Sequence, residues 1–364
     1  MPHHEQDRRV QAPTIEHPAW QPLLPPALPS DGLPGLAPGA PFAFAAPDDE
    51  TASALAGESV LVPLVTRGAL RLTGADRIEF LHGQVSHDVR GLRPGAARPA
   101  LRLDHRGRPR ADLVVVRRVE DLYLAVDDGR GPAVARELEA HVVFDQVSIE
   151  DLSAQLASLV VAGEAGLAAL RDALGGAELP RAAGACAQLP WRGSDLLLHA
   201  RLRGLGASLD VHLLGERLEE LWRALLSAGA RPIGERALAA ARVASGLAAA
   251  AAEGEGALPQ EAGLEDRISY RKGCYLGQEI MARIEARGSV HRSLARLVFA
   301  EPPRGDAASL GVQDLGGRTV GRLGTVARLP GGRWAGLAVV RNELALGDGV
   351  QALGVPARIE ARAA

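Results

Sequence analysis

The sequence is poor in several side chains that commonly mark function. It has a single lysine, Lys272, among 41 basic residues, and only three tyrosines and two cysteines. Cys186 and Cys274 are too few and too far apart for a disulfide framework, and two thiolates cannot hold a four-cysteine iron–sulfur cluster. The sequence therefore predicts no disulfide scaffold and no metal site.

Long apolar runs are also missing. No stretch approaches the ~20 uncharged apolar residues of a membrane span, and the opening residues, MPHHEQDRR, are too polar for a signal peptide. We therefore expect a cytoplasmic protein. A formal net charge of -3 argues against a protein whose main business is nonspecific nucleic-acid binding, although it leaves room for a local basic pocket.

The chain divides into three parts. Residues 1–57 contain 11 of the 24 prolines, so we expect a disordered extension there. Residues 58–288 alternate helices and short strands without regular βαβ units or a phosphate-binding glycine motif, which predicts an α+β domain; within it, 248–256 reads as a plain Ala/Gly/Glu connector. Residues 289–364 have short strands and glycine turns typical of a small β-barrel or sandwich.

The scarce residues gather in one window, residues 268–284. It holds Lys272, Cys274, the only methionine besides the first residue, Met281, and two of the three tyrosines, Tyr270 and Tyr275. A chain that uses arginine for nearly all its positive charge retains lysine where a compact ammonium does something that a planar guanidinium cannot. The clustering indicates a functional site.

The same window predicts a loop followed by a helix. Gly273 and Gly277 permit a tight turn and close approach of a ligand, while apolar residues at helical spacing predict a helix over 278–287 that stops at Gly288. The helix N-terminus favours an anion or a thiolate. Cys274, flanked by Arg271 and Lys272, is expected to have a lowered pKa.

Each of these residues also has an ordinary explanation. Cys274 could be a small buried hydrophobe and Lys272 a surface charge; taken together, the residues favour the functional interpretation. Asp112, at the head of the apolar run Leu113–Val116, is equally well explained as a cap on nearby backbone or as a site acid.

The residues Lys272-Gly273-Cys274-Tyr275-Leu276-Gly277-Gln278-Glu279 resemble the K-G-C-[FY]-x-G-Q-E signature of the YgfZ-type folate-binding proteins. These proteins are relatives of the aminomethyltransferase (GcvT) of the glycine cleavage system. The similarity extends to Pro259-Gln260-Glu261 upstream, to Ala282-Arg283 and Arg287-Gly288 downstream, and to segments 74–89 and 107–113. It covers nearly everything after the proline-rich extension.

The resemblance implies a GcvT-like folate-binding body followed by a small C-terminal β-barrel. It implies binding of tetrahydrofolate and a role in iron–sulfur cluster synthesis or repair, and through it in iron–sulfur-dependent tRNA modification. Cys274 and Lys272 are the candidate catalytic residues, although we do not expect a conventional enzyme. The expected folate-binding residues are Asp112, Tyr270, Lys272, Gly273, Cys274, Tyr275, Gly277, Gln278, Glu279 and Arg283.

Two alternatives remain. A true aminomethyltransferase carries two adjacent acids where this chain has Ala111-Asp112, and such enzymes lack the K-G-C signature, so one-carbon transfer is in doubt. A module that docks tRNA or a protein would use a strip of arginines; direct nucleic-acid binding is the weaker expectation, because arginines at this spacing are commonly a solvated helix face. We expect a monomer whose partners are folate and proteins of iron–sulfur metabolism. The arginines of the strip are Arg271, Arg283, Arg287, Arg292 and Arg296.

Overall fold

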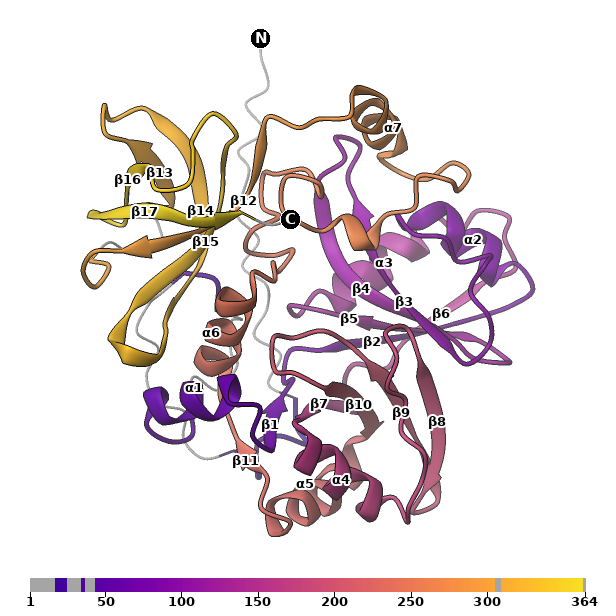
Figure 1. Ribbon diagram of the computed structural model, residues 1–364. Coiled ribbons are helices and arrows are strands. Elements are labelled where there is room, and N and C mark those ends of the chain that lie inside the picture. Colours follow the sequence, from indigo (N-terminus) through magenta and orange to yellow (C-terminus); the bar gives the residue numbers. More distant parts are fainter. Residues whose placement is uncertain (1–16, 25–33, 37–42, 305–308, 363–364) are drawn as a thin grey trace.

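A computed structural model describes residues 17–24, 34–36, 43–304 and 309–362 (Figure 1). Two β-sheets with flanking helices form the body, and a β-barrel follows at the C-terminal end. This α+β architecture is the predicted one. Within the described part of the chain, no helix combines the length and the hydrophobicity that crossing a bilayer requires.

The first sheet has its strands in the order β11-β1-β7-β10-β9-β8. Only the β1–β11 pair is parallel. Alternate residues of β10, such as Leu209 and Val211, pack in one apolar cluster with helices α4 (Glu164–Ala173) and α5 (Leu218–Ser227), which therefore cover one face. The strands are β1 (Val60–Pro63), β7 (Leu156–Ala162), β8 (Cys186–Trp191), β9 (Ser194–Ala200), β10 (Ser208–Leu214) and β11 (Arg231–Pro232).

The second sheet has the order β3-β4-β5-β2-β6 and is antiparallel throughout. Helices α2 (Arg77–Gln84) and α3 (Gly131–Glu139) cover its outer face, where Leu113 and Val115 of β4 are buried. The strands are β2 (Gly68–Thr73), β3 (Ala96–Leu103), β4 (Pro109–Arg117), β5 (Leu122–Val126) and β6 (Ser148–Asp151).

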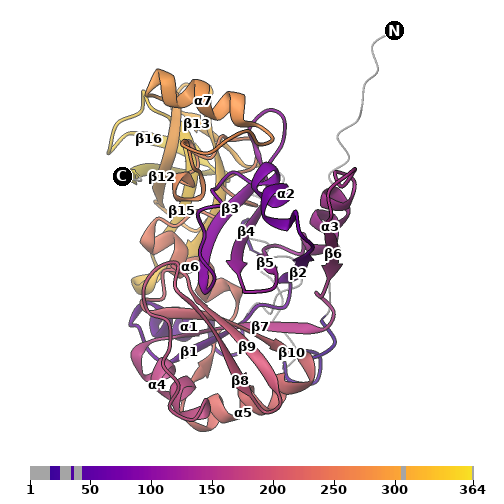
Figure 2. The same cartoon turned by 90° about the vertical axis from the view of Figure 1, so that its right-hand side faces the viewer.

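The inner faces of the two sheets pack against each other (Figure 2). Val114 of β4 and Tyr123 of β5 share an apolar cluster with Leu197 of β9. Strand residues alternate between faces, so Asp112 and Asp210, which are also buried, belong to these same inner faces. The fold therefore places ionisable side chains between two sheets, where they must be paired with one another.

The barrel is closed, in the order β12-β15-β14-β13-β16-β17. This closure confirms the predicted barrel and rules out the sandwich. Helix α6 (Glu235–Ser245) packs between the body and the barrel, and helix α7 (Gln278–Arg287) lies beside the β3–β4 hairpin (Figure 1). The strands are β12 (Arg292–Phe299), β13 (Gly311–Asp314), β14 (Thr319–Arg328), β15 (Trp334–Arg341), β16 (Gly349–Ala352) and β17 (Val355–Arg362); short 3-10 turns are Gly215–Arg217, Glu265–Arg267 and Pro330–Gly332.

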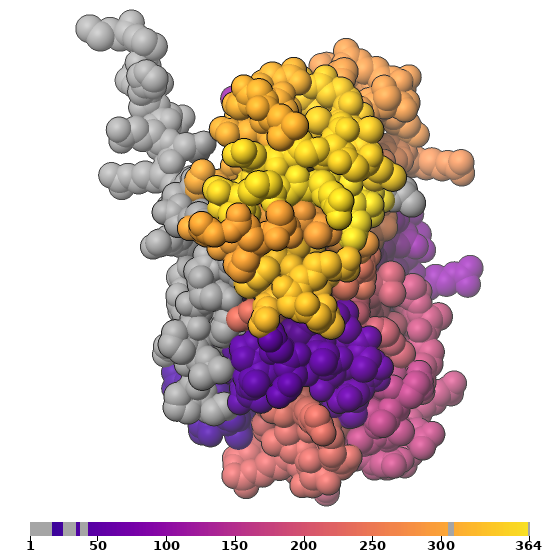
Figure 3. Space-filling view, turned by 60° about the vertical axis from the view of Figure 1, so that its left-hand side comes forward, coloured from indigo at the N-terminus to yellow at the C-terminus, as the bar shows by residue number. Residues whose placement is uncertain are grey.

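Part of the proline-rich segment is built into the molecule. Residues 47–55 form helix α1 (Pro47–Leu55), which packs against α6 and lies between barrel and body in the space-filling view (Figure 3). Trp20 is only 2% exposed and meets the Trp222 ring edge-on, with centroids 5.2 Å apart. The prediction of a disordered extension is therefore wrong for these residues. Residues 1–16, 25–33 and 37–42 lie outside the described part of the chain.

Candidate functional site

Lys272 is buried, and backbone carbonyl groups surround its ammonium group. Its Nζ donates hydrogen bonds to the carbonyl oxygens of Val85 at 2.6 Å, of His87 at 3.2 Å and of His82. These carbonyls lie at and just after the C-terminus of α2, where helical hydrogen bonding leaves acceptors unpaired. The ammonium also lies 4.6 Å from the centre of the Tyr275 ring. Lys272 is therefore not a surface charge, and it joins the signature loop to α2.

Burial lowers the pKa of Lys272 to about 8, against the opposing effect of Asp88. An ammonium presents three N–H groups from one atom, which suits three acceptors arranged around a point. A guanidinium spreads its donors across a plane and does not fit the same arrangement. This geometry gives a structural reason why the chain retains its one lysine.

The two cysteines lie in different environments. Cys274 is exposed in the loop before α7, so it is not the buried hydrophobe that the alternative interpretation required. Cys186 is half-buried at the edge of the first sheet, and burial raises the pKa of its thiol to about 11. Of the two thiols, Cys274 is the more accessible to a reagent or a partner; its predicted activation remains a prediction.

The remaining signature residues divide between packing and exposure. Gly277 has φ of 84° and packs so closely on the β3–β4 hairpin that an added Cβ would lie 2.7 Å from the carbonyl oxygen of Asp104. The close approach predicted for this glycine is therefore to the protein's own backbone. Tyr275 is buried, Tyr270 and Gln278 are half-buried, and Gly273, Glu279 and Arg283 are exposed.

The upstream motif Pro259-Gln260-Glu261 supports the signature. Gln260 Nε2 donates to the hydroxyl of Tyr270 at 2.9 Å and contacts the sulfur of Met281 at 3.3 Å. Glu261 accepts two hydrogen bonds from Arg292, at the start of the barrel. The two motifs thus fix each other and the adjoining barrel strand.

Asp112 is the centre of a second group of residues, between the sheets. It is 4% exposed, and its Oδ2 accepts hydrogen bonds from Arg201 at 3.1 Å and Arg267 at 2.5 Å. Arg201 also donates to Asp127 at 2.7 Å. Two atoms of this group, Asp112 Oδ1 and Arg201 Nη1, are buried without a hydrogen-bond partner. A buried acceptor and a buried donor left open in this way are suited to a polar ligand.

The acids of this group are tuned in opposite directions. Burial works to raise the pKa of Asp127, but Arg201 and Arg67 outweigh it and hold that pKa well below its usual range. Burial and the charges of Asp127 and Asp112 raise the pKa of Asp128 to about 7. Burial likewise raises the pKa of Asp112, against Arg267 and Arg201. Asp128 can therefore exchange a proton near neutral pH, a property common at functional sites.

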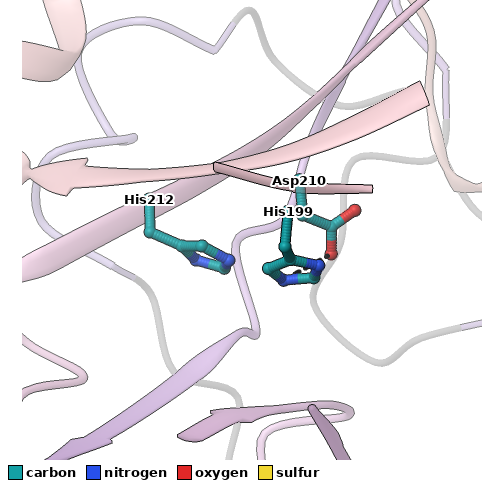
Figure 4. Close-up of side chains that lie close together, drawn as sticks. All are labelled: His199, Asp210 and His212. Carbon is teal, nitrogen blue, oxygen red and sulfur yellow. Dashed lines mark ion pairs between the residues drawn. The ribbon is translucent and has the colours of Figure 1, made fainter. Parts of the chain in front are cut away.

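The charge network continues deeper between the sheets. Arg67 bridges Asp127 at 2.6 Å and Asp210 at 3.2 Å, and Arg203 donates two hydrogen bonds to Asp210. His199 and His212 stack beside it, with ring centroids 5.1 Å apart (Figure 4). Their ring nitrogens and the Asp210 carboxylate lie within 4.8 Å of one another, a spacing that could hold a metal ion. Because Arg67 and Arg203 already pair with the Asp210 carboxylate, we assign His199, Asp210 and His212 to the charge network.

Asp112 is connected to the signature loop indirectly. Arg267, which binds Asp112, lies in the 3-10 turn that leads into the loop. Ser86 donates to the carbonyl of Arg267 at 2.6 Å and accepts from the amide of Leu101, the residue paired with Asp112 across the β3–β4 ladder. Among residues 272–279, all described, none forms a hydrogen bond or ion pair with Asp112. Asp112 and the loop 272–279 are therefore not in direct contact. They are connected through the turn that holds Arg267.

Sequence analysis missed four residues of the Asp112 group: Asp127, Asp128, Arg201 and Arg267. A signal existed for the acids, because Asp127-Asp128 directly follows the buried strand β5, and Asp112 directly precedes the apolar run of the neighbouring strand β4. The arginines gave no comparable signal. They come from distant parts of the chain and resemble the other arginines until the fold brings them together.

The fold and the site define an α+β protein with a charged centre between two sheets and a C-terminal barrel. A crystal structure of the glycine cleavage system aminomethyltransferase T from Bartonella henselae has this fold: the TM-score is 0.76 at 17% identity, covering 88% of this chain and 90% of that one. The GCVT N-terminal domain family matches residues 50–272, more than half of the chain. The chain belongs to that family.

Curated relatives agree with this assignment. The tRNA-modifying protein YgfZ of Yersinia pestis (strain Pestoides F) is 29% identical over 290 residues, which are 78% of this chain and 85% of that protein. The YgfZ of Yersinia pseudotuberculosis serotype O:3 is equally similar. A chloroplastic protein of Arabidopsis thaliana is 25% identical over 258 residues, and the match spans only 60% of that longer protein.

Proposed function

We propose that this protein binds a reduced folate, tetrahydrofolate, at Asp112, and that it acts as an accessory protein in iron–sulfur metabolism. The observation that supports this choice of ligand is that two buried atoms, Asp112 Oδ1 and Arg201 Nη1, have no hydrogen-bond partner. A pterin ring presents N–H donors and a carbonyl acceptor on one edge, which match one carboxylate oxygen and one guanidinium nitrogen. When bound, tetrahydrofolate supplies a carrier for one-carbon groups.

Binding requires a side-chain movement. Asp112 is 4% exposed, and the side chains of Arg201 and Arg267 are 14% and 13% exposed, so they screen the carboxylate from solvent. A ligand reaches Oδ1 if one of these arginines swings aside while the other keeps the carboxylate ionised. Side-chain rotation of this kind is common at binding sites.

The proposed role in iron–sulfur cluster synthesis or repair rests on the resemblance of residues 272–279 to the YgfZ-type signature. The relatives named tRNA-modifying protein support it, because some tRNA modifications depend on iron–sulfur enzymes. The proposed partners are therefore proteins of iron–sulfur assembly or iron–sulfur-dependent tRNA modification. We further propose that the protein acts as a cytoplasmic monomer and presents exposed Cys274 to these partners.

Calorimetric titration with tetrahydrofolate tests the ligand. We expect binding to the parent protein and at least tenfold weaker binding to Asp112→Asn, which removes the charge that organises Arg201 and Arg267. Asp172→Asn is the matched control, since its carboxyl is 71% exposed and lies on α4. Absence of heat and of any thermal shift at high ligand excess would reject the folate proposal.

Asp128 favours a second candidate function, aminomethyl transfer of the glycine cleavage type. Aminomethyltransferases carry two adjacent acids where this chain has Ala111-Asp112, so the sequence lacks one acid of that pair. The structure supplies another carboxyl from the end of β5, and its pKa is raised to about 7 in part by Asp112. An assay of aminomethyl transfer to tetrahydrofolate separates the two candidates: turnover that Asp128→Asn abolishes supports the enzyme, and folate binding without turnover supports the accessory role.

A further inference from the structure

A cavity of about 260 Å³ lies away from the Asp112 group, between the last turn of α6 and the wall of the barrel. The residues that line it come from α6 and from strands β12, β15 and β17, and none of them belongs to the charge network between the sheets. They include Ser245, Leu294, Arg296, Leu337 and Arg362. This cavity is separate from the proposed folate site.

Positive charge is in excess at this cavity. Arg296 donates to Glu360 at 2.8 Å, and Arg333 donates to the other oxygen of the same carboxylate at 3.0 Å. Arg362 forms no ion pair with any carboxylate of the described residues; its partners are the Ser293 hydroxyl and neutral carbonyl oxygens. Glu360 is thus shared by two arginines and Arg362 has no carboxylate partner, so the cavity attracts an anion.

The two lining guanidiniums are held in place and still have donors to spare. Arg362 uses both Nη atoms, donating to the carbonyl oxygens of Arg341 at 3.0 Å and Leu344 at 2.6 Å among others, which leaves its Nε–H. Arg296 donates Nη1 to the carbonyl oxygen of Ala244 at 2.7 Å, which leaves Nη2. Donors fixed by other contacts lose little entropy when a ligand binds.

The floor of the cavity is apolar. Leu294 and Leu337 are almost fully buried there, and Ala295 lies beside them. An inorganic ion would use the guanidiniums alone, whereas a small molecule with an apolar body would also fill the space beside these side chains. The volume of about 260 Å³ lies just below the usual range of ligand pockets, which limits the body to a short aliphatic chain or a single ring.

We propose that the cavity binds a small organic anion, with its carboxylate or phosphate group at Arg296 and Arg362 and its apolar body on Leu294 and Leu337. The acidic group accepts the free N–H donors of the two arginines. Ser245, exposed at the rim, also lines the cavity. The assignment holds whether or not folate binds at Asp112.

The test titrates the full chain with three one-ring probes, followed by ligand-observed NMR and thermal shift. Benzoate and phenyl phosphate represent the two sources of anionic charge, and benzyl alcohol is the neutral control. We expect at least one anion to bind and to stabilise the protein, and the alcohol not to bind. The better of the two anions identifies the acidic group.

Three variants locate the binding. Arg362→Gln is expected to weaken binding at least tenfold, and Ser245→Trp, which fills the rim without removing charge, is expected to block it. Arg358→Gln is the matched control on the same strand, because Arg358 is exposed and outside the cavity. The proposal is overturned if neither anion binds, if the alcohol binds equally well, or if both Arg362→Gln and Ser245→Trp bind like the parent. If only Asp112→Asn loses binding, the anion binds at the Asp112 site and the proposal for this cavity is wrong.

Discussion

The ammonium of Lys272 donates a hydrogen bond of 2.6 Å to the carbonyl oxygen of Val85, the C-cap residue of helix α2. The only lysine of the chain therefore closes a helix that lies 187 positions away in sequence. Its value to the protein is at least in part structural, since it satisfies carbonyl groups that would otherwise be buried without donors.

Replacing Lys272 by arginine is expected to lower the free energy of unfolding by about 2 kcal/mol, because a planar guanidinium cannot reach all three carbonyls. Urea unfolding measures the change. Arg271→Lys, on the exposed neighbour, is the control and should leave the midpoint unchanged. If Lys272→Arg is as stable as the parent yet no longer binds tetrahydrofolate, the ammonium serves the ligand and not the helix.

The two thiols are expected to react at very different rates. At pH 7.5 a thiol-specific reagent should modify Cys274 first, because Cys274 is exposed while Cys186 is half-buried with its pKa raised to about 11. Mass spectrometry after timed quenching assigns each adduct. Cys274→Ser should remove the fast phase and Cys186→Ser should retain it. Faster modification of Cys186 would contradict both the exposure and the pKa assignment.

Asp128→Asn is expected to stabilise the protein above pH 7. The folded-state pKa of about 7 exceeds the ordinary 3.8, so the folded state binds more protons between these values and loses stability as pH rises through this range. We expect a gain of about 1 to 2 kcal/mol, below the roughly 4 kcal/mol that three pKa units represent, because the residue is partly exposed. Asparagine also tolerates the φ of 59° found there.

Asp127→Asn is expected to have the opposite effect on stability to Asp128→Asn. The pKa of Asp127 is depressed when the protein folds, so its carboxylate contributes stability above the ordinary pKa and loses that contribution in acid. Thermal unfolding between pH 4 and pH 8 should therefore show the Asn variant of Asp127 destabilised at neutral pH. Equal pH profiles for the two variants would show that the acids are not tuned apart.

Trp20→Ala is expected to cost about 3 to 5 kcal/mol, because the side chain is buried against Trp222 and leaves a large void. The family match begins only at residue 50, so this loss would show that the preceding segment is part of the folded unit. Phe144→Ala, at a side chain that is 95% exposed, is the control. A Trp20→Ala protein as stable as the control would place the segment outside the cooperative fold.

The sequence predicted those features that depend on local pattern. The helix over 278–287 and its stop at Gly288 are confirmed, because apolar spacing and a left-handed glycine are both local signals. The barrel followed from short strands and glycine turns. For Asp112, neighbouring residues could not decide between a cap and a site acid, because its partners are residues 201 and 267.

Segment composition gave a wrong prediction where a single residue of the segment is buried in the folded protein. The connector 248–256 contains Glu253, which is 2% exposed and accepts hydrogen bonds from the amides of Ala249 at 2.7 Å and Thr325 at 2.8 Å. This glutamate therefore joins the connector to the barrel. Trp20 similarly lies in a proline-rich segment whose composition predicted disorder. A single buried side chain outweighs the composition of its segment when the tertiary fold supplies its partners.

The burial of Lys272 has a practical consequence for finding binding partners. With one lysine, 9% exposed and committed to three carbonyls, this protein offers almost no side-chain amine to acylating cross-linkers, to acetylating enzymes or to ubiquitin ligases. Proximity-labelling and cross-linking experiments on it should therefore target carboxyl groups or the exposed thiol.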